Sequence, residues 1–129
     1  MKFLSIYKTA ERSGPPSQEE MTTMGKLVEE GFKAGWLVAT EGCLPTALGA
    51  RVRKSGNQLT VTDGPFAESK EAIGGYFLLR VKTIEEAVAI AKDCPGLPYG
   101  IKVEVRQVLD ECPMSKQAVP DVELASATA

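Results

Sequence analysis

The stretch DGPFAESKEAIGGY, from Asp63 to Tyr76, is the most unusual passage of the chain, and the segments on either side are interpreted from it. An alternating segment ends on Asp63, and Gly64-Pro65 then stops it, because proline fixes its own φ and donates no backbone hydrogen bond. Charged residues cluster after the proline, and Gly74-Gly75 opens a second apolar segment. A rigid corner that carries ionisable groups between two strands is where we expect function.

Composition restricts the class of protein. The 129 residues are enough for one domain with a real core, and apolar content of 43% with 25% charge is ordinary for a globular chain. The net charge is −2 without a basic run, so we expect no nucleic acid partner. Because no stretch is long enough to span a bilayer, we expect no membrane association. Three cysteines, an odd number without metal-like spacing, indicate reduced thiols and a cytoplasmic location.

The chain contains no histidine, and this absence limits the chemistry available to it. Ser-His-Asp triads, Cys-His pairs and histidine-based metal sites are excluded within the chain. Proton transfer near neutral pH would need a carboxyl, lysine, tyrosine or cysteine with a perturbed pKa, or the substrate itself. We therefore predict neither a metal site nor a cofactor.

The periodicity of apolar residues and the helix-capping motifs predict the remaining helices and strands. Ser17 and Glu20 form a capping box ahead of an amphipathic helix over roughly 18–34, and Thr83 and Glu86 form a second box ahead of a helix that ends near Cys94. Predicted strands cover residues 2–8, 36–40, 50–54, 59–63, 76–81 and 101–106, of which 36–40 is expected to be buried on both faces.

The two strands before the corner are expected to form a hairpin around Gly56-Asn57. If those two residues are the loop, Val52 lies opposite Val61 and Ala50 lies opposite Asp63. This register places Asp63 on the apolar side of the hairpin.

The order strand, helix, strand, hairpin, strand, helix, strand predicts an α+β, ferredoxin-like βαββαβ sandwich with an inserted β-hairpin. Both helices must cover one face of the sheet. In each strand, the apolar residues that alternate along the chain are predicted to lie on that face: Leu4 and Ile6; Phe77, Leu79 and Val81; Ile101, Val103 and Val105.

The opposite face of the predicted sheet mixes aromatic, aliphatic and charged residues: Phe3, Ser5, Tyr7, Tyr76, Leu78, Arg80, Lys102, Glu104 and Arg106. It is too apolar for water and too polar for a dry core. A two-fold homodimer with facing sheets would cover it and enclose polar pockets. The alternative is a solvated face with ordinary exposed aromatics.

The DGPFAESKE motif with Gly74-Gly75-Tyr76 resembles the signature of the DGPF-domain branch of the YCII-related family. The start Met1-Lys2-Phe3-Leu4, the Cys94-Pro95 helix end and the segment Val103-Glu104-Val105-Arg106 are similar as well, so the likeness covers roughly 1–109. The resemblance implies a dimeric α/β barrel of ferredoxin-like subunits and a largely uncharacterised function. We assign 1–112 to this domain and 113–129 to a C-terminal tail that is loose or lies on a partner chain.

Better-understood relatives include small lyase- or isomerase-like enzymes proposed to use an aspartate with a histidine. Only the aspartate has a counterpart here, Asp63, which the resemblance makes the candidate catalytic residue. In the alternative, its carboxylate accepts hydrogen bonds from the amides of its own turn. Candidate ligand-binding residues, suited to a small anionic molecule, are Tyr7, Arg51, Lys70, Tyr76, Arg80 and Arg106.

Two functional hypotheses follow from different classes of protein. The first is a lyase- or isomerase-type enzyme in which Asp63 performs acid–base chemistry in a pocket of the dimer. The second is a non-catalytic ligand-binding or interaction module in which the corner is purely structural. The missing histidine supports the second hypothesis, and the rigid carboxylate supports the first.

Overall fold

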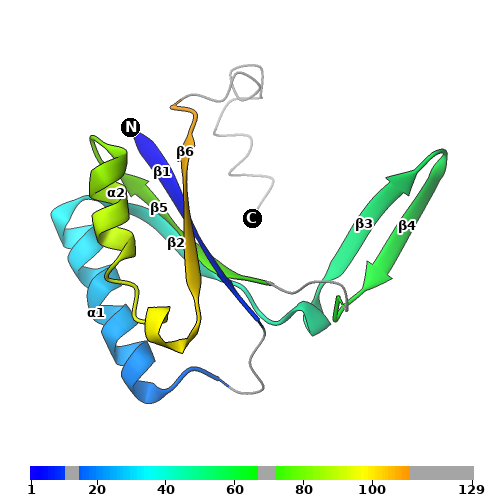
Figure 1. Cartoon of the computed structure of the whole chain (residues 1–129), viewed down its shortest axis with the longest axis horizontal. Coiled ribbons are helices and arrows are strands. Elements are labelled where there is room, and N and C mark those ends of the chain that lie inside the picture. The colour runs from blue at the N-terminus through cyan, green and yellow to red at the C-terminus, as the bar shows by residue number, and fades with distance from the viewer. Residues whose placement is uncertain (11–14, 67–71, 111–129) are drawn as a thin grey trace, which may run out of the picture.

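A four-stranded antiparallel sheet forms the centre of the protein, in the computed structural model that describes residues 1–10, 15–66 and 72–110. Two helices cover one face of this sheet, and a two-stranded hairpin projects from it (Figure 1). The elements are β1 (Lys2–Thr9), α1 (Gln18–Ala34), β2 (Leu37–Gly42), the 3₁₀ turn η1 (Thr46–Leu48), β3 (Ala50–Ser55), β4 (Gln58–Asp63), β5 (Ala72–Arg80), α2 (Ile84–Ala91), the 3₁₀ turn η2 (Leu97–Tyr99) and β6 (Lys102–Val108). The strand order β2-β5-β1-β6 is consistent with a ferredoxin-like βαββαβ plan, with β3-β4 inserted between β2 and β5.

The first helix begins and ends where the sequence predicts. The Ser17 hydroxyl accepts the Glu20 amide at 3.1 Å, while the Glu20 carboxylate accepts the Ser17 amide at 3.2 Å. Gly35 ends the helix with a φ of 85°, a left-handed conformation that glycine adopts without a Cβ penalty. In the described ranges, neither this helix nor α2 is long and apolar enough to cross a membrane.

The core lies between the sheet and the two helices. It contains buried apolar side chains from both layers: Phe3, Leu27, Leu37, Phe77, Leu79 and Ala87. Phe77, Leu79, Val103 and Val105 lie on the helix-covered face, as the alternation of their strands predicts.

The prediction for β1 is wrong in its choice of face. Phe3, Ser5 and Tyr7 lie beneath the helices, since Phe3 pairs with Leu79 and Ser5 pairs with Phe77 across the sheet. Phe3 and Ser5 are 0% and 2% exposed. Both faces of β1 are partly apolar, so the alternation of its residues does not decide which face is buried. The aromatic rings are the side chains that fill the space under the helices.

Leu4 and Ile6 therefore lie on the face without helices, where they pair with Leu78 and Tyr76. We call this surface the bare face. It is made of the side chains that alternate with the core residues of β1, β5 and β6: Lys2, Leu4, Ile6, Lys8, Tyr76, Leu78, Arg80, Lys102, Glu104 and Arg106. It remains a mixture of apolar and charged groups.

The second strand is not buried on both faces, contrary to prediction. β2 is an edge strand that pairs only with β5 among the described strands, and it contributes the buried Leu37 while Val38 is exposed. An edge strand with one partner and no covering layer on its outer face cannot bury both sets of side chains.

The hairpin register is as predicted. Val52 pairs with Val61 and Ala50 pairs with Asp63, and Gly56, with a φ of 59°, lies in the turn. At the corner, the Gly64 amide donates to the Gly49 carbonyl at 3.0 Å, and a Cβ at Gly64 would collide with the Thr46 carbonyl. The glycine after Asp63 is thus required by a close backbone approach.

Candidate functional site

A cavity of about 500 Å³ lies between the N-terminal half of α1 and the adjoining end of the sheet. Its described lining combines apolar side chains, three glycines of the sheet edge and a few polar groups: Tyr7, Pro16, Glu20, Met21, Met24, Gly25, Val28, Thr40, Glu41, Gly42, Gly74, Gly75, Phe77, Pro95, Gly96 and Ile101. This volume is within the range of small-molecule sites, which are concave and mostly apolar with few polar groups.

The cavity exists because the sheet presents glycines in place of larger side chains beneath part of the helix. Gly42 pairs with Gly75, and Gly75 pairs with Tyr7, so two consecutive strands present glycine at the same level. The register shift between Tyr7 and Lys8 leaves Gly74 without a partner on β1, which is a β-bulge. A Cβ on Gly75 would lie 2.6 Å from the Glu41 carbonyl oxygen, so the backbone packing there also requires glycine.

Tyr7 supplies the main hydrogen-bond donor of the cavity. Its ring packs against Phe77, with centroids 5.3 Å apart and planes at 58°. The pKa of the Tyr7 hydroxyl is raised well above its usual range, mainly by burial and to a smaller extent by the nearby Cys94. The group therefore stays protonated at neutral pH. Among the described residues, no hydrogen bond engages this hydroxyl, which is free to donate to a ligand.

Two further ionisable groups lie in this region: Cys94 is near Tyr7, and Glu20 is near Cys94. The Glu20 carboxylate is buried at 8% exposure and caps its own helix. Cys94 is a buried free thiol whose pKa is raised by burial, an effect that the backbone amides of Gly96 and Leu97 partly oppose. Cys43 is a second free thiol and is exposed, whereas Cys112 lies outside the described residues.

The predicted site residues do not gather in one place. Tyr7 lines the cavity, whereas Tyr76, Arg80 and Arg106 alternate onto the bare face. Arg51 lies on the hairpin, with its guanidinium carbon 4.3 Å from the centre of the Phe66 ring. Lys70 lies outside the described residues.

Asp63 lies at the base of the hairpin, exposed and apart from the cavity lining. Among the described residues, no hydrogen bond or ion pair engages its carboxylate, so the alternative in which it binds its own turn is not observed there. The described amide that follows it, on Gly64, donates to Gly49 instead.

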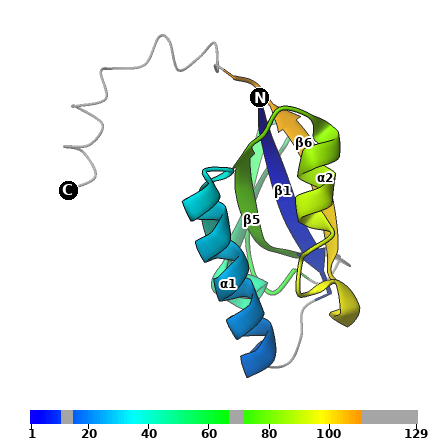
Figure 2. The ribbon, with the colours of Figure 1, turned by 90° about the vertical axis from the view of Figure 1, so that its left-hand side faces the viewer.

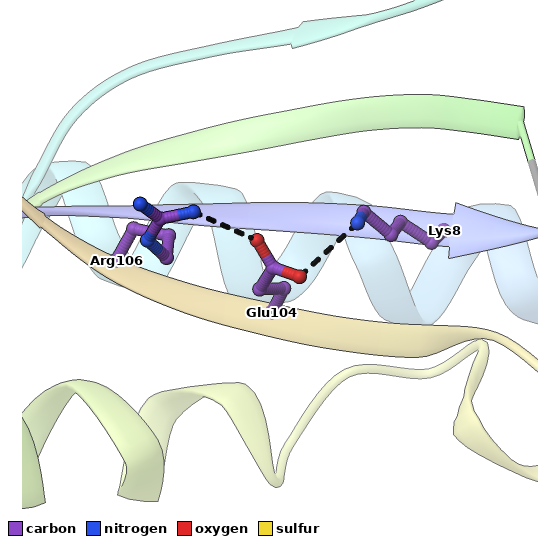
Figure 3. Close-up of polar contacts among 3 residues, drawn as sticks. All are labelled: Lys8, Glu104 and Arg106. Atoms are coloured by element: carbon purple, nitrogen blue, oxygen red, sulfur yellow. Dashed lines mark hydrogen bonds and ion pairs between the residues drawn. The ribbon is translucent and has the colours of Figure 1, made fainter.

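One charged cluster organises the bare face (Figure 3). Lys8 Nζ donates to Glu104 Oε1 at 3.1 Å, and Arg106 Nη1 donates to Glu104 Oε2 at 3.4 Å. The hydrogen bonds from Lys8 and then Arg106 hold the pKa of the Glu104 carboxyl below its usual range. Arg106 thus pairs with a carboxylate within its own subunit and keeps an exposed side chain.

Sequence reasoning missed Glu20 and the helix residues Met21, Met24 and Val28 as parts of a site. The sequence predicts Glu20 only as a helix cap and residues 18–34 only as an amphipathic helix. The pair Gly74-Gly75 was the usable signal, because adjacent glycines in a strand indicate either a bulge or space for a ligand. In the described ranges, no three metal-ligating acidic or cysteine side chains lie close enough to hold an ion.

The YCII-related domain family matches residues 1–118. The chain belongs to the YCII-related family. The match continues past residue 112 into the first residues of the segment that we predicted to be a tail. An uncharacterised protein of Rhizobium meliloti (strain 1021) is 31% identical over 85 residues, which are 66% of this chain and 68% of that protein. Membership of the DGPF branch stays a prediction.

Proposed function

We propose that this YCII-related chain binds a small, largely apolar molecule in the cavity between α1 and the sheet. The observation that carries the proposal is a ligand-sized hollow whose walls are mostly apolar and include Met, Val, Phe and Ile side chains, with the Tyr7 hydroxyl as an unengaged donor. Such a site favours a ligand with an apolar body and one hydrogen-bond acceptor, since burying an unpaired polar group is costly.

The polar groups of the cavity favour a neutral ligand over an anion. Its described lining includes the Glu20 carboxylate and neither lysine nor arginine, while the pairing of Glu41 with Tyr76 directs the Glu41 side chain to the bare face. An anion placed there would lose hydration without gaining a cationic partner. The ligand class that we infer for the cavity is therefore a neutral molecule, such as a ketone, ester or aromatic ether.

The neutral apolar dye N-phenyl-1-naphthylamine tests this proposal, because its fluorescence rises when it leaves water. We expect saturable binding of one dye per chain. Met24→Trp fills the cavity and should weaken binding at least about tenfold, the equivalent of about 1.4 kcal/mol. Lys26→Trp is the matched control, because it adds the same ring to the exposed side of the same helix. Equal dye binding by the two variants would refute the assignment of the cavity.

Acid–base chemistry at Asp63 is a further step beyond binding. Within one subunit Asp63 does not line the cavity, so an enzymatic role requires that a second subunit or a ligand bring the two together. Asp63→Asn distinguishes the hypotheses: a catalytic aspartate predicts loss of turnover with unchanged dye binding and melting. A binding or interaction module, in which Asp63 has no chemical role, predicts no activity in either protein.

We also propose that the chain forms a homodimer through the bare face. Leu4, Ile6, Tyr76 and Leu78 are only partly buried in the isolated subunit, and no described element covers them. A second copy placed sheet to sheet would remove these side chains from water. Sedimentation equilibrium tests this directly: the parent chain should be dimeric, and Leu78→Lys should shift it to monomer.

A small anionic molecule is the second candidate ligand, and it would bind on the bare face. Alternation places five cations there, Lys2, Lys8, Arg80, Lys102 and Arg106, against the Glu104 carboxylate. The edge strand β2 adds Glu41, which pairs with Tyr76. Two such faces in a dimer would repel, and a bound anion would relieve that repulsion. Inorganic phosphate should then tighten dimerisation more than chloride does at equal ionic strength.

A further inference from the structure

The β3–β4 hairpin (Ala50–Asp63), here called the arm, forms a sheet of its own. Its two strands pair with each other and with no strand of the central sheet. All of its residues are exposed except Arg51, which is half-buried. Figure 1 shows the arm extending away from the body of the protein.

One side of the arm is apolar although nothing in the subunit covers it. The pairing of Val52 with Val61 and of Lys54 with Leu59 places these side chains on one face, while Arg51, Arg53, Thr60 and Thr62 occupy the other. Val52, Leu59 and Val61 are 67%, 71% and 64% exposed. Alternation of this kind is typical of strands with one buried face, and an isolated two-stranded hairpin is marginally stable in water.

The position of the arm indicates what covers it. The helices lie on one side of the central sheet and the arm extends on the other, the side of the bare face (Figures 1 and 2). A second copy seated on the bare face would therefore lie beside the arm. Two-fold symmetry then gives each subunit one arm to extend and one to receive.

Apolar area also favours a second copy as the occupant. The apolar side chains of the bare face, Leu4, Ile6, Tyr76 and Leu78, are already half-buried, so each of them has less area left to bury than a fully exposed side chain. A stable interface removes roughly 1,600 Å² from water. Three largely exposed aliphatic side chains on each of two arms would supply apolar area that the facing sheets lack.

The distribution of charge also favours a second copy as the partner of the arm. The arm carries three cations and one carboxylate, a charge of +2, within a chain of net charge −2, so the remaining residues together carry −4. The arm of one copy is thus attracted at long range to the body of another, which favours encounter between copies.

We propose that the arm is an intersubunit clasp: in the homodimer, the apolar face formed by Val52, Leu59 and Val61 packs against the second copy. The inference rests on the proposed homodimer and adds a contact beyond the facing sheets. Because Asp63 ends the same face of the arm, the clasp also brings the Asp63 carboxylate next to the partner subunit.

Val61→Lys and Thr60→Lys form a matched pair that tests the clasp. They add the same charge at neighbouring positions of β4, on opposite faces of the arm. Burying a valine stabilises by roughly 1.5 kcal/mol, about tenfold in affinity, and each dimer contains two arms. Val61→Lys should therefore weaken dimerisation on the order of 100-fold by sedimentation equilibrium, whereas Thr60→Lys should leave it within a few-fold of the parent. Dye binding checks that both variants keep the body folded.

A photo-crosslinking residue at position 59, in a mixture of isotopically light and heavy chains, supplies a direct readout. Cross-links between a light and a heavy chain support the clasp. If the parent is dimeric but Val61→Lys dimerises equally well and position 59 cross-links only within its own chain, the clasp is wrong while the sheet-to-sheet dimer stands. A parent chain that remains monomeric at millimolar concentration overturns both proposals and leaves the cavity proposal untouched.

Discussion

Gly31 lies where helix α1 contacts β2, and replacing it with alanine measures how tightly the two layers are packed. A methyl group on Gly31 would lie 2.7 Å from Cη2 of Trp36 and 2.8 Å from Cβ of Leu37. Ordinary carbon–carbon contacts are about 3.5–4.0 Å. Cβ of Leu37 is fixed to its backbone, so the strain cannot be relieved by turning that side chain alone.

Two effects of opposite sign decide the outcome at Gly31. Alanine is favoured over glycine inside a helix by about 1 kcal/mol. Overpacking costs about 1–3 kcal/mol, and the upper end applies because the collision involves a backbone-fixed atom. We expect Gly31→Ala to lower the free energy of unfolding by about 2 kcal/mol, or the melting temperature by roughly 8 °C for a domain of this size.

Gly25 provides the control on the same helix, since a Cβ there meets no atom within 4 Å. Gly25→Ala should therefore show the helix propensity alone and raise the free energy of unfolding by about 1 kcal/mol. Urea denaturation of the parent and both variants measures the difference. If Gly31→Ala is as stable as Gly25→Ala, the close approach of α1 to β2 is wrong, and with it the helix packing that encloses the cavity.

Two other substitutions probe the sheet. The Ser5 hydroxyl is buried without a hydrogen-bond partner among the described residues, so Ser5→Ala should raise the free energy of unfolding by about 1 kcal/mol in thermal or urea denaturation; a loss of stability would indicate a partner for the hydroxyl. The pKa of Glu104 is lowered by Lys8 and Arg106, so its stabilising effect is complete above the ordinary glutamate pKa of about 4.3 and is lost as the pH falls through the lowered value. Glu104→Gln should accordingly flatten the acid limb of the stability–pH profile, and an unchanged acid limb would contradict the cluster.

Much of the fold could be predicted from local signals. The Ser17–Glu20 capping box, the Gly35 helix end and the hairpin register around Gly56 each depend on a few neighbouring residues, and the structure has all of them. The order of these elements was enough to indicate the βαββαβ plan, because few topologies connect them without crossing.

The candidate site was predicted much less completely. Asp63 and the arginines drew attention because charged residues at a rigid corner are conspicuous in a sequence. The cavity instead depends on glycines that pair across strands, Gly42 with Gly75 and Gly75 with Tyr7. It also depends on Cys94, which lies near both Tyr7 and Glu20 although the three belong to different segments. Contacts between segments that are distant in the sequence cannot be predicted from the local pattern of residues.

The sequence by itself therefore determined the elements, their caps, the hairpin register and the family, since each is encoded within a few neighbouring residues or one specific motif. Tertiary structure alone decided which side of β1 faces the helices, because Phe3 and Tyr7 on one side compete with Leu4 and Ile6 on the other. It also decided that Asp63 lies at the exposed end of the arm while Gly74 and Gly75 of the same stretch line the hollow under α1. The physical reason is that packing depends on how side chains from all layers fit together. The hydrophobic periodicity of a single strand or helix does not contain this information.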